Sequence, residues 1–459
     1  MIIRKFKSNI VAHLSYFIGS EGEAVVVDPE RDCLSYLEVA RRENMRIKYV
    51  FETHRNEDFI IGSQELAHLS GAKIYHGPWP EFQYGNVLID GQAFNVGALK
   101  VTAIHTPGHT PGCVSYAVSD TDSGKETVLV CTGDTLFVND VGRTDFGGPE
   151  KRREWPENLY NSIFKKLLPL GDHVILCPAH GAGSVCGSNI ALREWSTLGL
   201  ERLMNPLLQL SREEFVEHKM KEHHEYAPYF KLMEKFNVEG APFLGAGKNY
   251  DALPLNEFKQ KMEEGAVVLD LRSPSAFGGA HIKGSYSIPP GLLSFTGWFI
   301  PFDKLIVIVM DESGDLESFS SLARIGYDNI VGYLGGGLAS WYSAGYPLEA
   351  RAHLITANEL KAWLDSGNEC FILDTRSKDE FEEGHIKSAT HIYLGRLQER
   401  IDEVPRTLPI MVVCGSGNRA SVATSILLRN GYEEVYNFLG AMRAWKKLGY
   451  SLSRAHIIK

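Results

Sequence analysis

The chain carries a polar segment directly after the apolar run 47–51, and this segment reads Thr53-His54-Arg55-Asn56-Glu57-Asp58-Phe59. Three further polar segments also follow apolar runs: His105-Thr106-Pro107-Gly108-His109-Thr110, Gly133-Asp134-Thr135 and Pro178-Ala179-His180-Gly181. Runs of this kind, rich in β-branched residues, predict strands at 47–51, 99–104, 128–130 and 173–176. Side chains at strand ends are held by a stiff scaffold and stay open to solvent. The four segments therefore predict a metal site at one end of a sheet.

The segments together offer His54, His109 and Asp134 as three metal ligands. A full loop of the pattern His-x-His-x-Asp-His would carry histidine where this chain has Asn56 and Phe59. A phenyl ring cannot coordinate and an amide is a poor ligand for zinc, so a two-zinc site is disfavoured. Two imidazoles and a carboxylate with open positions suit a mononuclear Fe(II) that activates oxygen.

The bulk composition is that of a protein with several domains. At 459 residues, with 44% hydrophobic and 23% charged residues, the chain is too long for one core and should form two to four domains. A formal charge of -10 argues against nucleic acid or an anionic membrane as a partner. No apolar run is long enough to span a bilayer, and the start lacks a signal-peptide pattern. Seven cysteines without Cys-x-x-Cys spacing suit a reducing cytoplasm.

The sequence pattern changes twice along the chain. From 191 to 236 leucines recur at helical spacing among charged residues, and 241–247 is predicted to be a linker. Two similar segments follow at 267–283 and 371–387, each with an aspartate, an arginine and a histidine at the same spacing: Asp270, Arg272 and His281; Asp374, Arg376 and His385. A period of about 100 residues predicts tandem domains, because solenoid units are far shorter. Strands alternating with helices predict a small parallel sheet in each.

These motifs, in this order, resemble a known family. The first 245 residues resemble the metallo-β-lactamase superfamily and, within it, the persulfide dioxygenases, on the four segments above together with Gly142-Arg143-Thr144-Asp145-Phe146 and the extension of the last segment to Gly183. The two later domains resemble rhodaneses, so the whole chain resembles the bacterial persulfide dioxygenase–rhodanese fusions. The resemblance implies an α/β fold with an αββα sandwich at 1–245, in which 190–245 is a helical extension and linker. It also implies rhodanese-like domains at 246–350 and 351–459.

The resemblance places one Fe(II) per chain on His54, His109 and Asp134, with zinc as an alternative occupant. The persulfide sulfur and O₂ would take the remaining positions. Asp58 and His180 are expected beside the ligands; the alternative is that each is a buried polar group satisfied by backbone. Arg143 would meet an anionic part of the thiol carrier or brace its own loop through Asp145.

The last domain contains a loop between the apolar run 410–413 and a predicted helix at 421–428: Cys414-Gly415-Ser416-Gly417-Asn418-Arg419-Ala420. A cysteine at such a turn faces backbone N–H groups and a helix N-terminus, which favours the thiolate. The thiolate can attack a sulfane sulfur, and the same N–H groups stabilise the persulfide that results. Gly415 and Gly417 give the turn its backbone freedom. Arg419 would point inward to hold the loop or an anionic donor such as thiosulfate. The alternative is a structural cysteine at a strand end.

The middle domain lacks this chemistry. Aligning Ser313 with Ser416 places Asp311 opposite Cys414, and the loop 311–315 is acidic and has no thiol. A carboxylate cannot carry a persulfide, and its charge repels anionic donors. We expect this copy to be inactive, and the aspartate, arginine and histidine that the two copies share to brace their domains.

The resemblance thus implies a cytoplasmic persulfide dioxygenase that converts a thiol persulfide and O₂ to sulfite and free thiol. A Cys414 persulfide would exchange sulfur among thiol, sulfite and thiosulfate in sulfide detoxification, and related proteins form dimers or larger assemblies. Two alternatives stay open. One is a zinc thioester hydrolase of the glyoxalase II type, which needs a metal-activated water. The other is a non-catalytic metal-binding domain that feeds Cys414. No motif selects the thiol carrier or the direction of sulfur transfer.

Overall fold

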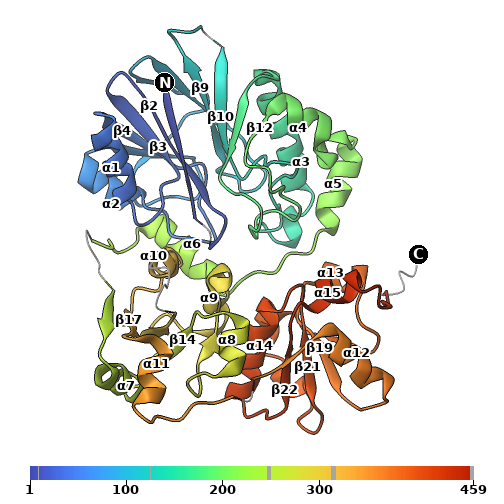
Figure 1. Ribbon diagram of the computed structural model, residues 1–459. Helices are drawn as coiled ribbons and strands as arrows, with labels where there is room; N and C mark the ends of the chain where they lie inside the picture. Colours follow the sequence, from blue (N-terminus) through green and yellow to red (C-terminus); the bar gives the residue numbers. More distant parts are fainter. Residues whose placement is uncertain (9, 125, 246–249, 312–316, 351, 455–459) are drawn as a thin grey trace. The chain divides into compact units, whose positions relative to one another are not determined.

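A computed structural model describes residues 1–8, 10–124, 126–245, 250–311, 317–350 and 352–454 (Figure 1). The end of the predicted linker, 246–247, and the middle-domain loop positions 312–315 lie outside the described residues. The chain forms two compact units, one of Met1–Lys248 with Ala323–Gly326 and one of Asn249–Leu322 with Tyr327–Lys459. The second unit contains a separate sheet for each copy of the repeat.

The first unit is built on two six-stranded sheets of mixed direction. One sheet has the order β1-β2-β3-β4-β5-β6, with β1 (Ile2–Lys7), β2 (Leu14–Ser20), β3 (Glu23–Val27), β4 (Arg46–Phe51), β5 (Lys73–His76) and β6 (Asn86–Val87). The other has the order β12-β11-β10-β9-β8-β7, with β7 (Ala93–Val96), β8 (Leu99–His105), β9 (Val114–Asp120), β10 (Thr127–Gly133), β11 (Ile175–Pro178) and β12 (Ser196–Thr197).

The two faces of β2 pack into different cores. Tyr16 and Ile18 of β2 pack between the sheets together with Val101 of β8, whereas Phe17 points the other way, toward the helices. This alternation follows from the two-residue period of a strand, and because both faces of the sheet are covered here, β2 is buried along its whole length. The predicted strands of this unit are confirmed within a few residues.

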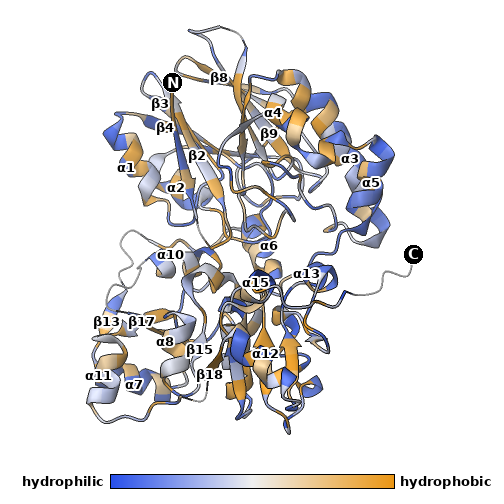
Figure 2. Cartoon of the chain, turned by 45° about the vertical axis from the view of Figure 1, so that its right-hand side comes forward, coloured by the Kyte–Doolittle hydropathy of each residue, from blue (hydrophilic) through white to orange (hydrophobic). Residues whose placement is uncertain are grey.

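Helices cover the outer face of each sheet (Figure 1). On the first sheet lie α1 (Leu34–Arg42) and α2 (Ser63–Ser70), and on the second α3 (Glu154–Ser162), α4 (Leu198–Met204) and α5 (Arg212–Lys221), followed along the chain by α6 (Phe230–Glu239). Figure 2 shows hydrophobic and hydrophilic residues together on α1 and α3, as expected of helices that cover one face of a sheet. The predicted αββα sandwich is confirmed. Within 191–236 the chain forms α4, α5 and the start of α6, with the strand β12 before α4 and non-helical residues at 222–229.

The second unit contains two five-stranded sheets in which every pairing is parallel. The order β13-β17-β16-β14-β15 is made by β13 (Asp251–Leu253), β14 (Val267–Asp270), β15 (Tyr286–Ser287), β16 (Ile306–Val309) and β17 (Ile330–Leu334), with α7 (Leu255–Glu263), α8 (Pro274–Gly279), α9 (Thr296–Phe299), α10 (Glu317–Arg324) and α11 (Gly337–Ser343). The order β18-β22-β21-β19-β20 is made by β18 (Ala352–Ile355), β19 (Phe371–Asp374), β20 (Thr390–His391), β21 (Ile410–Val413) and β22 (Val435–Phe438), with α12 (Ala357–Asp365), α13 (Lys378–Glu383), α14 (Asn418–Arg429) and α15 (Ala441–Lys447). The predicted parallel sheets are confirmed.

Candidate metal centre and sulfur-transfer loop

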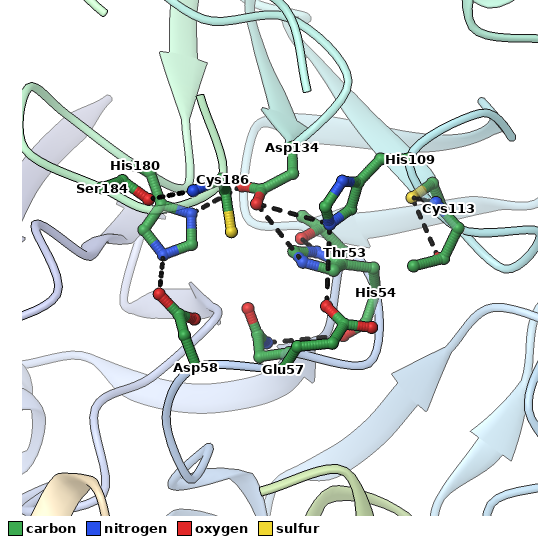
Figure 3. A network of polar contacts seen from close by, with 12 residues as sticks. Thr53, His54, Glu57, Asp58, His109, Cys113, Asp134, His180, Ser184 and Cys186 are labelled. Carbon is green, nitrogen blue, oxygen red and sulfur yellow. Dashed lines mark hydrogen bonds and ion pairs between the residues drawn. The ribbon is translucent and has the colours of Figure 1, made fainter. Parts of the chain in front are cut away.

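The four polar segments of the first unit meet where their strands end. The turn after β4 carries His54, the loop after β8 carries His109, the end of β10 leads to Asp134, and the end of β11 leads to His180. All four side chains are buried. Figure 3 shows them converging on one space, with the carboxylates of Glu57 and Asp58 reaching the same space from the first loop.

Two glycines let these loops approach each other closely. Gly133 has φ +54°, and a Cβ there would lie 2.5 Å from Oγ1 of Thr53. A Cβ at Gly142 would lie 1.9 Å from the carbonyl oxygen of Asp134. Both positions therefore require glycine, one for its backbone conformation and both for space.

The three predicted ligands bring their free atoms together. Nε2 of His54 lies 3.7 Å from Oδ2 of Asp134, and Nε2 of His109 lies 3.6 Å from the same oxygen. None of these three buried atoms has a hydrogen-bond partner among the described residues. Two ligands on bonds of about 2.1 Å lie about 3.0–3.4 Å apart, so a small inward movement would seat a cation between them.

Hydrogen bonds at the far side of each ring decide which nitrogen faces the centre. Nδ1 of His109 donates to the carbonyl oxygen of Arg143 at 2.8 Å, which leaves Nε2 with its lone pair free. Oγ1 of Thr53 donates to Asp28 at 2.7 Å, so it accepts from Nδ1 of His54 at 2.9 Å. Such outer contacts fix the tautomer of a metal-binding histidine. Burial lowers the pKa of His54 to about 4, so this ring is neutral at pH 7.

His180 links the two carboxylates that flank the centre. Its Nδ1 donates to Oδ1 of Asp134 at 2.7 Å, and its Nε2 lies 3.3 Å from Oδ2 of Asp58. Burial alone would lower the pKa of His180, but the two carboxylates outweigh it and hold the pKa well above its ordinary value. His180 and Asp58 lie beside the proposed ligands, and His180 contacts side chains there. Asp58 has no hydrogen-bonded side-chain oxygen within the described part of the chain.

Two residues that the sequence reasoning did not select also face the centre. Oε2 of Glu57 lies 3.6 Å from Nε2 of His109, and the side chain is buried. The Cys186 thiol lies within 4.8 Å of ligand atoms of Asp58 and His180. The signal for Glu57 was an acidic residue inside the ligand loop; for Cys186 the sequence held no comparable signal, because the residue lies beyond the recognised segment.

The substituted loop positions do not replace the missing histidines. The amide nitrogen of Asn56 donates to the carbonyl oxygen of His54 at 3.4 Å. Phe59 is buried against the ring of His13, with ring centroids 3.9 Å apart. Neither side chain therefore offers a metal the nitrogen that a histidine would provide.

Arg143 is engaged inside its own loop. Its guanidinium donates two hydrogen bonds to Asp145, both of 2.6 Å, and lies over the ring of Phe146. The guanidinium is buried. Because Arg143 also holds His109 through its carbonyl oxygen, this geometry favours the bracing alternative over contact with a thiol carrier.

The predicted sulfur-transfer loop lies between β21 and α14, and helix α14 begins at Asn418. The backbone N–H of Gly417 donates to Sγ of Cys414 at 3.0 Å, and the cysteine is buried. Gly417 has φ +108°, a conformation that favours glycine. The residues that begin α15 hold the same loop, because the N–H of Met442 donates to the carbonyl oxygen of Cys414.

Arg419 is paired with a residue that the sequence reasoning did not select. Its two terminal nitrogens donate to the carboxylate of Glu380, each at 2.7 Å. Burial raises the pKa of Glu380, but the hydrogen bonds and charge of Arg419 outweigh this effect and bring the pKa to about 2. Arg419 was predicted to hold either the loop or an anionic donor. In this structure it binds Glu380 and so holds the surroundings of the loop.

Replacing Glu380 with glutamine should make the stability of the chain less dependent on pH. The pKa falls from 4.5 to about 2 on folding, so the ion pair stabilises fully above about pH 4.5 and is lost as the pH falls through 2. The melting temperature of the variant should therefore be lower at pH 7, and the difference should vanish toward pH 2. Glutamine still supports the capping box that Ser377 and Glu380 form at α13.

A matched control lies on the same helix. Glu382 pairs with Lys378 at 3.8 Å on the surface, where such pairs contribute little. Glu382→Gln should leave the pH profile of melting unchanged. Equal profiles for the two variants would contradict a stabilising role of the Glu380–Arg419 pair.

The framework residues of the two repeats brace their domains, as predicted. Arg272 donates to both oxygens of Asp270, and Arg376 does the same to Asp374. The shared histidines donate to backbone carbonyls in the preceding helix turn. Asp311, which stands opposite Cys414 in the alignment, is exposed after β16.

Comparison with known proteins matches the domains separately. Residues 9–180 match the model of the metallo-beta-lactamase superfamily, and residues 254–344 and 356–448 each match that of the rhodanese-like domain. Persulfide dioxygenase ETHE1 of Bos taurus is 31% identical over 234 residues, which cover 49% of this chain and 77% of that protein. The Homo sapiens protein of that name is 30% identical over 226 residues, which cover 47% and 79%.

A crystal structure of a metallo-beta-lactamase from Staphylococcus aureus subsp. aureus COL superposes with a TM-score of 0.63 at 29% sequence identity. It covers 73% of this chain and 98% of its own. Among the described residues, no helix has both the length and the apolar character needed to cross a bilayer. The chain belongs to the metallo-beta-lactamase superfamily through a first domain related to persulfide dioxygenase ETHE1, and two rhodanese domains follow that domain.

Proposed function

We propose that the first domain is an Fe(II)-dependent persulfide dioxygenase and that the last domain is a sulfurtransferase acting through Cys414. The observation that carries the first part is the set of buried atoms without hydrogen-bond partners: Nε2 of His54, Nε2 of His109 and Oδ2 of Asp134. Leaving such atoms unpaired in the interior is costly, and a cation offsets that cost. The similarity to persulfide dioxygenase ETHE1 supports persulfide as the substrate, and the donor set of two imidazoles and a carboxylate supports iron as the cation.

The residues present fit a metal with open positions. His54, His109 and Asp134 would hold the ion from three loops, and an Fe(II) bound there would offer adjacent positions to a persulfide sulfur and O₂. His180 orients the Asp134 carboxylate through Nδ1, and Thr53 and the Arg143 carbonyl orient the two imidazoles. Zinc remains an alternative occupant of the same ligands.

The proposed reaction is R-S-SH + O₂ + H₂O → R-SH + SO₃²⁻ + 2 H⁺. The terminal sulfur gives up four electrons and O₂ takes them up, so no further reductant is needed. Water supplies the third oxygen of sulfite. His180 lies between Asp134 and Asp58 and can hold a proton there.

The proposed sulfur transfer uses the loop of the last domain. The Cys414 thiolate attacks the outer sulfur of thiosulfate, the S–S bond of the donor breaks, and sulfite leaves. The N–H of Gly417, which already points at Sγ, stabilises the negative charge on the persulfide formed. A thiol acceptor then takes the sulfur, or the reaction runs in reverse. Residues Gly415, Ser416 and Asn418 complete the cradle.

Metal analysis paired with oxygen uptake tests the proposal. Protein purified without oxygen and loaded with iron should hold one iron per chain and consume O₂ with small-molecule persulfides, with sulfite as the product. Absence of uptake with sulfur transfer intact would instead select a metal-binding domain that only feeds Cys414. Assays with several persulfides would identify the thiol carrier.

One observation favours a second candidate, the zinc thioester hydrolase. Asp58, His180 and Cys186 place ligand atoms within 4.8 Å of one another beside the first group, as a second metal would require. Two zinc ions per chain and thioester cleavage without oxygen uptake would support this function. Cytoplasmic location and self-association stay predictions.

A further inference from the structure

Glu57 has no role in the three-ligand site, yet its carboxylate faces that site. The residue lies in the turn after β4, three positions after His54, and it is buried. Its Oε1 accepts a hydrogen bond from Arg55 at 3.0 Å, which aims the other oxygen inward. That oxygen, Oε2, has no hydrogen-bond partner in the described part of the chain.

The free oxygen of Glu57 is aimed at the same space as the other ligand atoms. It lies 3.6 Å from Nε2 of His109, which is also 3.6 Å from Oδ2 of Asp134. Ligand atoms of His54, Glu57 and His109 lie within 4.8 Å of one another. Figure 3 shows Glu57 and Asp134 reaching the two imidazoles from different sides.

Two buried carboxylates beside two imidazoles each keep one inner oxygen without a hydrogen-bond partner among the described residues. Arg55 donates only to the outer oxygen of Glu57, so the inner oxygen keeps no hydrogen bond. The inner oxygens of Glu57 and Asp134 both face Nε2 of His109, where either a proton or a divalent cation would satisfy them. A single divalent cation offsets both negative charges and gives every unpaired atom of this group a partner.

We infer that Glu57 is a fourth protein ligand of the metal, so that two imidazoles and two carboxylates hold the ion. This inference rests on the proposed iron site and deepens it. Glu57 provides an oxygen next to the position where Asn56 lacks a metal-binding nitrogen. Six-coordinate iron would keep two positions, enough for one persulfide sulfur and one O₂. The second carboxylate also makes the donor set harder, which favours iron over softer metals.

The test compares metal binding by Glu57→Gln and by the unchanged chain, with Co(II) as a spectroscopic probe. In Glu57→Gln the affinity for Co(II), measured by chelator competition, should fall by about 10–100-fold or more. Loss of a residue that only supports a ligand already costs about that much, and loss of a ligand should cost at least as much. The visible absorption of bound Co(II) should also change, because its intensity and position depend on coordination number. Glu57→Asp, which keeps a shorter carboxylate, should recover part of the affinity.

Arg55→Met serves as the matched control. It removes the hydrogen bond that orients Glu57 and keeps the carboxylate, so Co(II) affinity should fall less than in Glu57→Gln and the spectrum should stay close to that of the unchanged chain. Melting of metal-free samples shows whether each variant folds. The gain in melting temperature on addition of Co(II) should be smaller for Glu57→Gln than for the unchanged chain.

The outcomes separate this inference from the proposed function. Unchanged Co(II) affinity and spectrum in Glu57→Gln would overturn the fourth ligand, even if the iron-loaded chain consumes oxygen. If Glu57→Gln binds Co(II) more weakly but the unchanged, iron-loaded chain never consumes oxygen, the inference that Glu57 is a ligand stands and the proposed dioxygenase activity is overturned. Loss of metal binding in Arg55→Met equal to that in Glu57→Gln would show a structural ion pair and overturn the inference.

Discussion

Replacing Asp134 with alanine should strongly weaken metal binding at the centre and, with it, remove the proposed persulfide-dependent oxygen uptake. Oδ2 of Asp134 lies 3.6–3.7 Å from both imidazoles, and Oδ1 accepts the hydrogen bond from His180. The substitution therefore removes a ligand and frees the residue that orients it. Iron affinity should fall by at least about 10²-fold, more than for loss of a supporting contact. Iron content after dialysis and oxygen-electrode traces measure the two effects.

The more conservative Asp134→Asn separates charge from shape. It keeps one oxygen at the centre and loses the negative charge, so its iron affinity should lie between those of Asp134→Ala and the unchanged chain. Circular dichroism of the metal-free variants checks that both fold. One iron per chain at unchanged affinity in Asp134→Ala would contradict the assigned ligand set.

Replacing Cys414 with serine should abolish sulfur transfer and leave oxygen uptake unchanged. A serine hydroxyl is a far weaker nucleophile than a thiolate at pH 7 and cannot form a persulfide, so the rate of sulfite release from thiosulfate should fall by at least about 10³-fold. The proposed metal ligands all lie in the first unit, whereas Cys414 lies in the second. Sulfite release with a thiol acceptor and oxygen uptake with a persulfide measure the two activities on the same sample.

Cys370→Ser is the matched control for this result. Cys370 is a partly buried free cysteine of the same domain that lies outside the loop. Its replacement should leave both activities unchanged. Sulfur transfer that persists in Cys414→Ser, or that disappears in Cys370→Ser, would place the reacting thiol elsewhere.

The sequence predicted the fold well because the patterns that carry it are local. Apolar runs such as 47–51 correspond to strands within a few residues, and the repeated Asp-x-Arg pattern marked two parallel sheets. The loop at Cys414 was also predictable, because a strand, two glycines and a helix follow one another along the chain. The partner of Arg419 was not, since Glu380 comes from a helix 39 positions earlier and no local pattern links the two.

By itself the sequence determined which residues stand at the strand ends, and hence that His54, His109 and Asp134 can meet. β8 and β10 belong to one sheet and β4 to the other, so the apolar packing between the two sheets brings the three strand ends together. Only the tertiary structure decided where the side chains between them point. Glu57 faces the centre because Arg55 donates to its outer oxygen. Asn56 turns to the backbone because its amide donates to the His54 carbonyl oxygen. Both contacts arise only once the loop is folded and buried.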